Sequence, residues 1–299
     1  MKTSPFAIAA VIAVLSASCD KKAPDAAEAK AAANPNEVVL AGKHFLPAAG
    51  TIATKEMTMM MTGATLKIEA GGQTMNGTAD QSTKGKETME VISKDKVRKT
   101  VVSKKTEGKM TINGQDQPTP PQPDPLEGTP VILERSGDKW TAKLESNATA
   151  DTSQQAALEK MAGEMTKDSD FEMYGDKPRK PGDKWTSDPA KMTMFGDSGN
   201  VSGTCSTEFV EIADYQGTRC AVLKSNLDIK GKTGEKGQGE AMNLSFKAEA
   251  ICHRSIADQV DMAVDVKGTM TVDGAPAPNV TMVMSGPMTM KETTTVKKP

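Results

Sequence analysis

The sequence predicts a mainly β protein: an antiparallel barrel or sandwich built from two related β-meander halves joined by one central α-helix. Three observations predict this class. Apolar side chains recur at every second position in many segments, which is the period of a strand with one buried face. Turns rich in glycine separate these segments. Threonine is abundant, whereas aromatic residues make up only 3% of the chain, so the core must consist of aliphatic side chains and methionine.

Residues 1–18 have the three parts of an export signal. A positively charged start precedes an uncharged apolar run over residues 6–15, and small residues then lead to Cys19. The apolar run is too short to span a bilayer as a stable helix. Residues 15–19 (LSASC) resemble a bacterial lipoprotein signal, whose cleavage leaves a cysteine that carries acyl chains such as palmitate. The segment departs from that pattern at Ser16, where an aliphatic residue is usual.

This resemblance implies an exported protein of the bacterial cell envelope, held to a membrane by a lipid on Cys19 and facing the periplasm or the exterior. The small residues before the cysteine also suit ordinary signal peptidase, so simple secretion is one alternative and a retained anchor is another. Residues 19–37 follow as a polar tether with no apolar stripe to bury. Such a spacer would hold a folded domain clear of the lipid headgroups.

The two halves are inferred from a repeated phrase. Residues 108–114 read GKMTING, residues 268–274 read GTMTVDG, and a loop containing proline follows each of them. We therefore expect a duplicated meander, with a first β half over residues 38–150 and a second over residues 168–299. The alternative is two small, separate β domains.

Residues 151–167 have a helical period instead of a strand period. Asp151 or Thr152 can cap the first turn, and Gln155 is placed for a capping box. We expect this helix to connect the two halves and to cover an end or a face of the sheet. Three apolar side chains lie on one face of it: Leu158, Met161 and Met165.

The alternation also places individual strands. Residues 65–70 alternate between apolar and polar side chains and end at a Gly-Gly turn. Further along, Val97, Lys99 and Val101 share one face.

A Gly-Asp turn leads into a strand at both tryptophans, Trp140 and Trp185. We interpret the two indoles as closing hydrophobic edges of the sheet, and a pair that stacks on a ligand is the alternative.

Residues 178–185 (PRKPGDKW), followed by a β-rich half that contains residues 217–222 (GTRCAV), resemble an uncharacterised family of bacterial secreted lipoproteins that is classed as a domain of unknown function. The likeness covers most of the mature chain. It implies an envelope location and a β architecture, and it brings no activity and no functional residue with it.

The residues favour a binding protein over an enzyme. The two histidines, His44 and His253, belong to no recognisable triad, and the chain has no nucleophile-elbow motif, phosphate-binding loop or zinc ligand set. We expect no cofactor. Cys252 and His253 are neighbours that point to opposite faces of a strand, so they do not bind one ion together. His44 is expected at the surface or as a cap. The net charge of -2, without a basic patch, excludes a nucleic-acid partner.

Three cysteines follow the tether, and an exported chain can form disulfides. The first hairpin after Cys205 would place it opposite about residue 227, beyond bridging distance of Cys220. The next hairpin would place Cys220 opposite about residue 251. We therefore predict a Cys220–Cys252 disulfide, with Cys205 reduced and buried. Three reduced, buried thiols are the alternative.

Methionine is unusually frequent, with 20 residues and several Met-x-Met pairs. On a strand each such pair presents two thioethers on one face. We interpret them as core side chains that fill the inner face of a sheet poor in aromatic residues. Two alternatives remain open: a soft-metal site for Cu(I) and the lining of a cavity for a hydrophobic ligand. The Cu(I) candidates are Met57, Met59, Met61, Met282, Met284, Met288 and Met290.

These features predict a non-enzymatic, membrane-anchored envelope lipoprotein that acts as a binding or scaffold module. The alternatives are a periplasmic carrier of lipid or another hydrophobic ligand, and a Cu(I)-binding protein. A carrier needs a large apolar cavity, whereas a scaffold needs only a packed interior. The expected partners are a membrane, through the lipid anchor, and a hydrophobic ligand or another envelope protein.

Overall fold

The computed structural model describes residues 36–119, 123–192, 201–233 and 242–299. The predicted export signal, Cys19 and all but the last residues of the predicted tether lie outside these ranges. Within them the chain is mainly antiparallel β structure, as the alternation predicted. None of the helices in these ranges has the length and apolar character needed to cross a bilayer.

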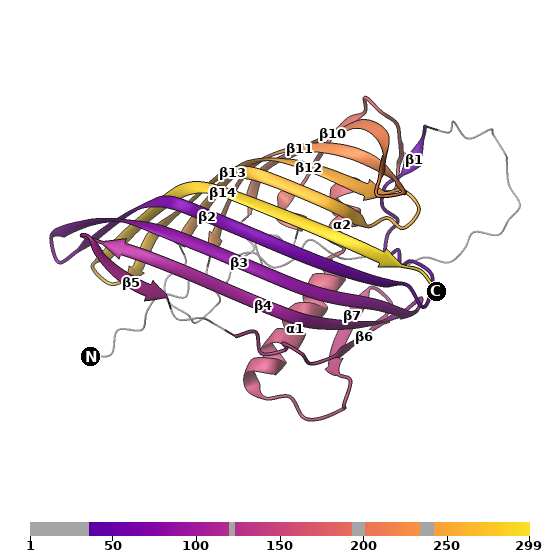
Figure 1. The fold of residues 1–299 in the computed structure, drawn as a ribbon, viewed down its shortest axis with the longest axis horizontal. Helices are drawn as coiled ribbons and strands as arrows, with labels where there is room; N and C mark the ends of the chain where they lie inside the picture. Colours follow the sequence, from indigo (N-terminus) through magenta and orange to yellow (C-terminus); the bar gives the residue numbers. More distant parts are fainter. Residues whose placement is uncertain (1–35, 120–122, 193–200, 234–241) are drawn as a thin grey trace, which may run out of the picture.

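One sheet of twelve strands dominates the described part of the chain (Figure 1). Its strands are β2 (Ile52–Ala70), β3 (Gln73–Ser93), β4 (Lys96–Ile112), β5 (Gln115–Thr119), β6 (Val131–Ser136), β7 (Lys139–Leu144), β9 (Lys184–Ser187), β10 (Ser202–Tyr215), β11 (Thr218–Thr233), β12 (Met242–Ser255), β13 (Asp261–Ala277) and β14 (Val280–Lys297). They run in the order β7-β6-β4-β3-β2-β14-β13-β12-β11-β10-β9, and β5 pairs with β4 beside this path. Two short strands, β1 (Val38–Val39) and β8 (Pro178–Arg179), form a separate pair.

The first and last long strands of the sheet, β2 and β14, pair with each other and so join the N-terminal strands to the C-terminal strands. The repeated phrases lie in β4 and β13, which are not neighbours in the sheet. Their common origin stays a prediction.

The sheet is open, so the closed barrel among the predicted arrangements is not formed. Its two edges, β7 and β9, are covered by helices instead of pairing with each other. The helices are α1 (Thr152–Lys167), α2 (Ser169–Tyr174) and a short 3₁₀ turn, η1 (Pro189–Lys191). The backbone N–H of Trp140 in β7 donates to Thr166 Oγ1 of α1 at 3.1 Å. On the other edge, Trp185 Nε1 and Ser187 Oγ of β9 donate to the carbonyl oxygen of Met173 in α2 at 2.9 and 2.6 Å.

Helix α1 confirms the helical segment predicted over residues 151–167, and the three side chains expected on one face are buried. Asp151 is the N-cap. Its side chain accepts from the backbone N–H of Gln154 at 2.8 Å, and the Gln154 side chain accepts from Asp151 N at 3.2 Å. The capping box therefore uses Gln154 and not the predicted Gln155, because Asp151 instead of Thr152 occupies the cap. Asp168, in a left-handed conformation with φ 47°, separates α1 from α2.

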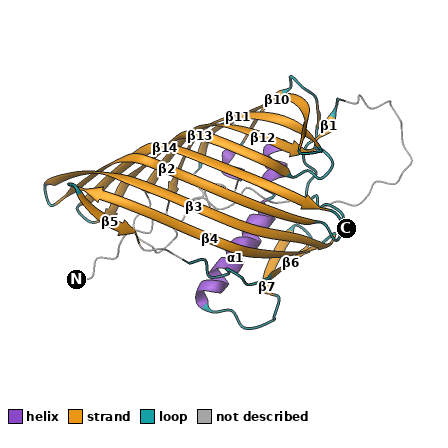
Figure 2. Ribbon diagram, viewed as in Figure 1, coloured by secondary structure: helices purple, strands orange, loops and turns teal. Residues whose placement is uncertain are grey.

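Both helices lie on one face of the curved sheet, which we call the inner face (Figure 2). Apolar side chains of the long strands point to this face, and strand β12 alternates between buried and exposed residues from Met242 to Cys252. A main core cluster extends over β2, β14, β13, β12, β11 and β10 and includes Met173 and Tyr174 of α2. A second cluster lies beneath α1, against β4, β6 and β7. The outer face carries threonine and charged side chains, as the alternation predicted.

Candidate ligand-binding site

The two central strands of the sheet place their methionines on the inner face. Met59 lies opposite Met290 and Met61 lies opposite Met288, and all four are at most 7% exposed. Met60, between them, points outward and is 46% exposed. Three further methionines continue this inner stripe on the same two strands: Met57, Met282 and Met284. The predicted shared face of the Met-x-Met pairs is therefore confirmed.

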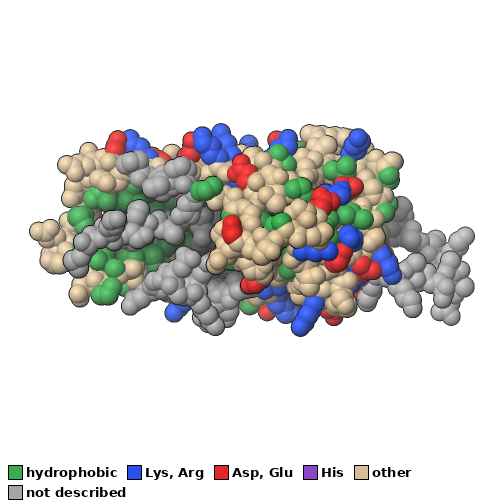
Figure 3. Space-filling view, turned by 90° about the horizontal axis from the view of Figure 1, so that it is seen from below, with side chains coloured by type: hydrophobic (Ala, Val, Ile, Leu, Met, Phe, Trp, Pro, Cys, Tyr) green, Lys and Arg blue, Asp and Glu red, His purple; other side chains and the backbone are tan. Residues whose placement is uncertain are grey.

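Toward the β2–β3 turn, at the end of the sheet that we call the hairpin end, the inner face remains apolar. Leu66, Met284, Val272 and Leu244 stand in one row across four neighbouring strands, each opposite the next. Among the described residues, no helix lies beneath this end of the sheet (Figures 1 and 2). Figure 3 shows hydrophobic side chains gathered in the hollow there. The apolar inner face thus extends well beyond the two helices.

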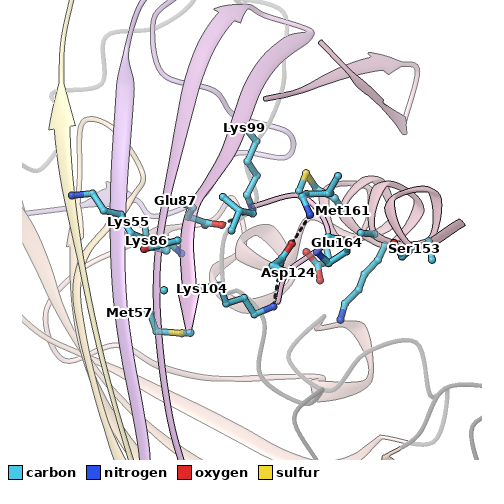
Figure 4. Close-up of a pocket in the computed structure, with 18 of the residues that line it drawn as sticks. Lys55, Met57, Lys86, Glu87, Lys99, Lys104, Asp124, Ser153, Met161 and Glu164 are labelled. Atoms are coloured by element: carbon cyan, nitrogen blue, oxygen red, sulfur yellow. Dashed lines mark hydrogen bonds and ion pairs between the residues drawn. The ribbon is translucent and has the colours of Figure 1, made fainter. Parts of the chain in front are cut away.

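A cavity of about 300 Å³ lies between the inner face and α1 (Figure 4). One wall comes from β14, β2, β3 and β4, and the other from residues 124–126 and from α1. Met57 of the methionine stripe and Met161 of α1 both line it. The cavity therefore joins the apolar inner face to the helix that covers it.

Charged side chains cross the sheet wall of this cavity in a row that we call the charge ladder: Glu292, Lys55, Glu87 and Lys99, from β14, β2, β3 and β4. Lys55 Nζ lies 2.9 Å from Glu292 Oε1, and Lys99 Nζ lies 3.0 Å from Glu87 Oε2. Lys55 and Glu87 are directly opposite each other in the strand register. The signs alternate along the ladder, so each charge has an opposite neighbour.

The ladder is largely buried, and removal from water is the largest influence on the pKa values of Glu292 and Lys55. Removal from water raises the pKa of Glu292 to about 6, although Lys55 acts in the opposite direction. Burial lowers the pKa of Lys55, but Glu292 and Glu87 outweigh that effect and leave it above its ordinary value. A carboxylate and an ammonium held together in this way cost desolvation free energy that their attraction offsets only when the geometry is good.

The helix wall and the mouth of the cavity add further charges. Lys104 Nζ lies 3.0 Å from Asp124 Oδ2. Lys160 and Glu164 lie one turn apart on α1 and line the cavity, and neither has an ion-pair partner within the described ranges. Burial raises the pKa of Glu164, against the lowering effect of Lys99 and Lys160. Glu164 and Met161 on the helix stand across the cavity from Glu87 and Lys99 on the sheet (Figure 4).

A second group of buried charges, the arginine cluster, does not line this cavity, but it lies close enough that Asp261 acts electrostatically on Lys55 and Glu292 of the ladder. Arg254 Nη1 contacts Asp261 Oδ1 at 2.5 Å and its Nη2 contacts Asp170 Oδ2 at 2.8 Å. Its Nε donates to the carbonyl oxygen of Leu40 at 2.7 Å, and its guanidinium lies 4.3 Å from the centre of the Tyr174 ring. Burial raises the pKa of Asp170 to about 6, with Arg254 opposing the rise. The cluster ties the N-terminal segment, α2, β12 and β13 together.

The predicted Cys220–Cys252 disulfide is not formed, because Cys205, Cys220 and Cys252 are free and buried. Cys205 lies opposite Leu227, as predicted. Cys220, however, lies opposite Ser255, and Cys252 lies opposite Leu223. Strand β12 is therefore shifted by four residues relative to β11, because Cys220 was predicted to lie opposite residue 251. A shift by an even number of residues keeps every side chain on its expected face of the sheet. Alternation alone therefore cannot distinguish the two registers.

Burial also raises the pKa values of the cysteine thiols. It raises the pKa of Cys220 to about 11 and that of Cys252 well above its ordinary range. Because the thiolate is the reactive form, these thiols stay protonated at neutral pH and are poor nucleophiles and metal ligands.

The two histidines do not form a site. His44, expected at the surface or as a cap, is buried: its Nε2 lies 2.9 Å from Asp138 Oδ1, and its backbone N–H donates to Asp168 Oδ2 at 2.6 Å. His253 faces away from the buried Cys252 and stacks on Tyr215, with ring centres 4.8 Å apart. In the described ranges, no group of three or more His, Cys, Asp or Glu side chains is placed to hold a metal ion.

The two tryptophans lie in the edge strands, as predicted. Trp140 of β7 is buried against α1, and Trp185 of β9 packs beneath the Arg179 guanidinium, which lies 3.9 Å from the indole ring centre. Both indoles close edges of the sheet.

The charge ladder was missed at the sequence level, although one signal was present. Lys99 was predicted to share a face with Val97 and Val101, and on an apolar face a lysine is unexpected unless it has a buried partner. Lys55 and Glu292 likewise continue the alternation of Met57 and Met290 on their strands. A charged residue in phase with an apolar stripe is the pattern that could have revealed the site.

Comparisons with known proteins give no family assignment for the chain. No family model and no curated protein match it. A solved structure described as lipid-protein interactions in lipovitellin matches with a TM-score of 0.43 and 8% identity. The matched region covers 84% of this chain and 26% of the lipovitellin chain.

A DUF1329 family protein from Desulfovibrio piger has a TM-score of 0.18 and 9% identity over 83% of this chain and 85% of that one. The translocator domain of autotransporter NalP from Neisseria meningitidis has a TM-score of 0.19 and 9% identity, covering 83% and 89%. The chain spans about a quarter of the lipovitellin chain. Scores this low give no information about function, so the site is interpreted from its own geometry.

Proposed function

We propose that the chain is a non-enzymatic lipoprotein of the bacterial cell envelope, anchored through Cys19, that binds a hydrophobic ligand such as a lipid on the inner face of its sheet. One observation supports this most directly: the apolar inner face extends beyond the helices that cover it, toward the hairpin end. A sheet with an apolar face needs a second layer over that face. A hydrocarbon ligand would pack against this face, whose side chains Leu66, Met284, Val272 and Leu244 are at most 5% exposed.

The composition of the face supports a ligand made of flexible hydrocarbon. Methionines line the central strands, and their unbranched, polarizable side chains adapt to partners of irregular shape. A face built for one rigid partner would be expected to use branched and aromatic side chains with fixed rotamers. The sequence has few aromatic side chains.

The affinity for such a ligand should depend on chain length. Burial of one methylene contributes about 0.8 kcal/mol, so each added methylene should tighten binding about fourfold until the face is filled. We expect this series to appear when full-length protein in mild detergent is titrated with linear alcohols of increasing length and binding is followed by native mass spectrometry.

Matched variants on one strand test where the ligand lies. Met61→Gln places an amide on the inner face, and Met60→Gln makes the same change on the outer face of β2. We expect Met61→Gln to weaken alcohol binding by about tenfold, since a buried amide without a partner costs about 1–3 kcal/mol, and Met60→Gln to leave binding unchanged. Circular dichroism checks that both variants fold. Absence of alcohol binding by the unaltered protein, or equal effects of the two substitutions, would refute the proposed site.

The anchor has its own test. Cells grown with labelled palmitate should incorporate the label into the protein, and Cys19→Ser should abolish incorporation. A signal that persists in the Cys19→Ser variant would assign the lipid to another residue.

A further inference from the structure

We propose that the cavity beneath α1 is the headgroup site of the ligand, and that it takes a zwitterionic headgroup, with an ammonium and a phosphate or carboxylate in one small unit. This inference rests on the proposed function and names the chemical class of its ligand. Hydrocarbon would lie along the methionine stripe, and the headgroup would lie between the charge ladder and α1.

The apolar face and the cavity are continuous through one side chain. Met57 lines the cavity and packs against the main core cluster. It lies opposite Glu292 of the ladder, and Met59, which is next on the same face, lies opposite Met290. An amphiphile on this stripe would therefore bring its polar end to the ladder within about two residues of strand, or roughly 7 Å.

The size of the cavity restricts what it can hold. Small-molecule sites span roughly 300–1,000 Å³, and this cavity of about 300 Å³ is at the lower limit. Since a water molecule occupies about 30 Å³ in the liquid, the space corresponds to about ten waters. That is enough for a phosphoethanolamine-sized group but too little for a whole lipid, so the tail must lie elsewhere.

The charges favour a headgroup that carries both signs. Within the ladder the two lysines and two glutamates balance each other. Lys160 and Glu164 on the opposite wall have no ion-pair partner among the described residues, and they offer one positive and one negative group to a ligand. A simple anion would meet the unpaired carboxylate of Glu164, and a simple cation would meet Lys160. A zwitterion can satisfy both.

The cost of the ladder also points to a role other than stability. It occupies inner-face positions on strands whose neighbouring inner positions hold methionine and valine. Replacing a buried ion pair by apolar side chains of similar volume is often neutral or stabilising, so the folded state does not need these charges. A preorganised set of buried charges does serve polar recognition, because its desolvation cost is incurred during folding and not during binding.

The test compares three probes with the same twelve-carbon chain: a lysophosphatidylethanolamine, the plain alcohol and an anionic lysophosphatidic acid. They are titrated into full-length protein in mild detergent. We expect the zwitterion to bind at least tenfold more tightly than the alcohol and more tightly than the anion. In Glu164→Gln this advantage over the alcohol should fall to about threefold or less. Glu159→Gln, a neighbouring change on α1 that does not line the cavity, should keep the full advantage.

Each outcome is decisive. Equal affinities for zwitterion and alcohol would overturn the headgroup site while leaving the hydrophobic-ligand proposal intact. Tighter binding of the anion would overturn the zwitterionic assignment, as would a Glu164→Gln variant that keeps the full advantage. Failure of all three probes to bind would refute the proposed function itself.

Discussion

The arginine cluster and the charge ladder are both buried groups of charges, yet they differ in their surroundings. In the arginine cluster, Arg254 binds two carboxylates and a backbone carbonyl and stacks on Tyr174, and it joins four separate segments of the chain. In the ladder, the charges come from four adjacent strands that are already held together by backbone hydrogen bonds, and they face a cavity. The first group connects elements that would otherwise be loosely attached. The charge ladder adds little to the attachment of its four strands, because backbone hydrogen bonds already join them.

This difference is the one expected between a structural use of buried charge and the proposed binding use. A structural cluster has its donors engaged within the protein and its removal should damage the fold. A binding cluster faces open space beside uncommitted groups such as Lys160 and Glu164, and its removal should affect recognition more than stability. Two measurements test this distinction, and a third tests the methionine stripe beside the ladder.

The largest effect is expected from Arg254→Met. Loss of the guanidinium leaves Asp170 and Asp261 buried without a counter-charge, so the free energy of unfolding should fall by about 3–5 kcal/mol. Lys99→Met is the matched change in the ladder, where Glu87 still lies opposite Lys55 and beside the cavity, so the loss should be about 2 kcal/mol or less. Urea unfolding followed by tryptophan fluorescence measures both. Equal losses would erase the distinction between the two clusters.

A smaller effect, which depends on pH, is expected from Glu292→Gln. Burial raises the folded-state pKa of Glu292 from 4.5 to about 6, so the folded protein holds this proton more tightly than the unfolded chain does. As pH rises from about 4.5 through 6, the unaltered protein should lose about 2 kcal/mol of stability relative to the Gln variant, which cannot ionise. Below that window the difference should be constant.

Unfolding curves for the pair at several pH values between 4 and 8 provide the measurement. A stability difference that runs the other way, with the unaltered protein gaining relative to the variant as pH rises, would show that Lys55 dominates over burial. The ladder would then resemble the arginine cluster.

The smallest effect is expected from the double substitution Met59→Leu and Met290→Leu in the methionine stripe. Swaps that conserve volume in a core cost less than about 1.5 kcal/mol, so the fold and alcohol binding should persist. The same variant tests the remaining Cu(I) candidate function, because these two thioethers face each other across β2 and β14. On equilibrium dialysis, we expect neither protein to take up Cu(I). Uptake by the unaltered protein that is lost in the variant would favour the soft-metal site.

The local pattern of the sequence predicted much of the fold. Alternation identified the strands around residues 65–70 and Val97, the inner face of the methionines and the edge positions of Trp140 and Trp185, and the helical period located α1. These features depend on neighbours in sequence. What could not be predicted depends on partners far away in the chain.

Three such features were missed. The register between β11 and β12 differs by four residues from the predicted one, which no alternation can reveal. His44 is buried because Asp138 and Asp168 approach it from distant segments. The alternation shows charged residues in phase with the apolar stripe but not their pairing, since each charge of the ladder has its partner on another strand.

The pairing of β2 with β14 has a consequence for how the molecule is assembled. It joins residues as distant as Ile52 and Lys297, so the sheet has a very high contact order and should fold slowly. Glu292 and four of the seven methionines of the stripe lie on β14, and they meet their partners on β2 only when this last strand pairs. Until then the edge of β2 opposite β3 is unpaired and prone to aggregation. If the inner face binds the proposed ligand, binding can begin only after β14 has paired with β2.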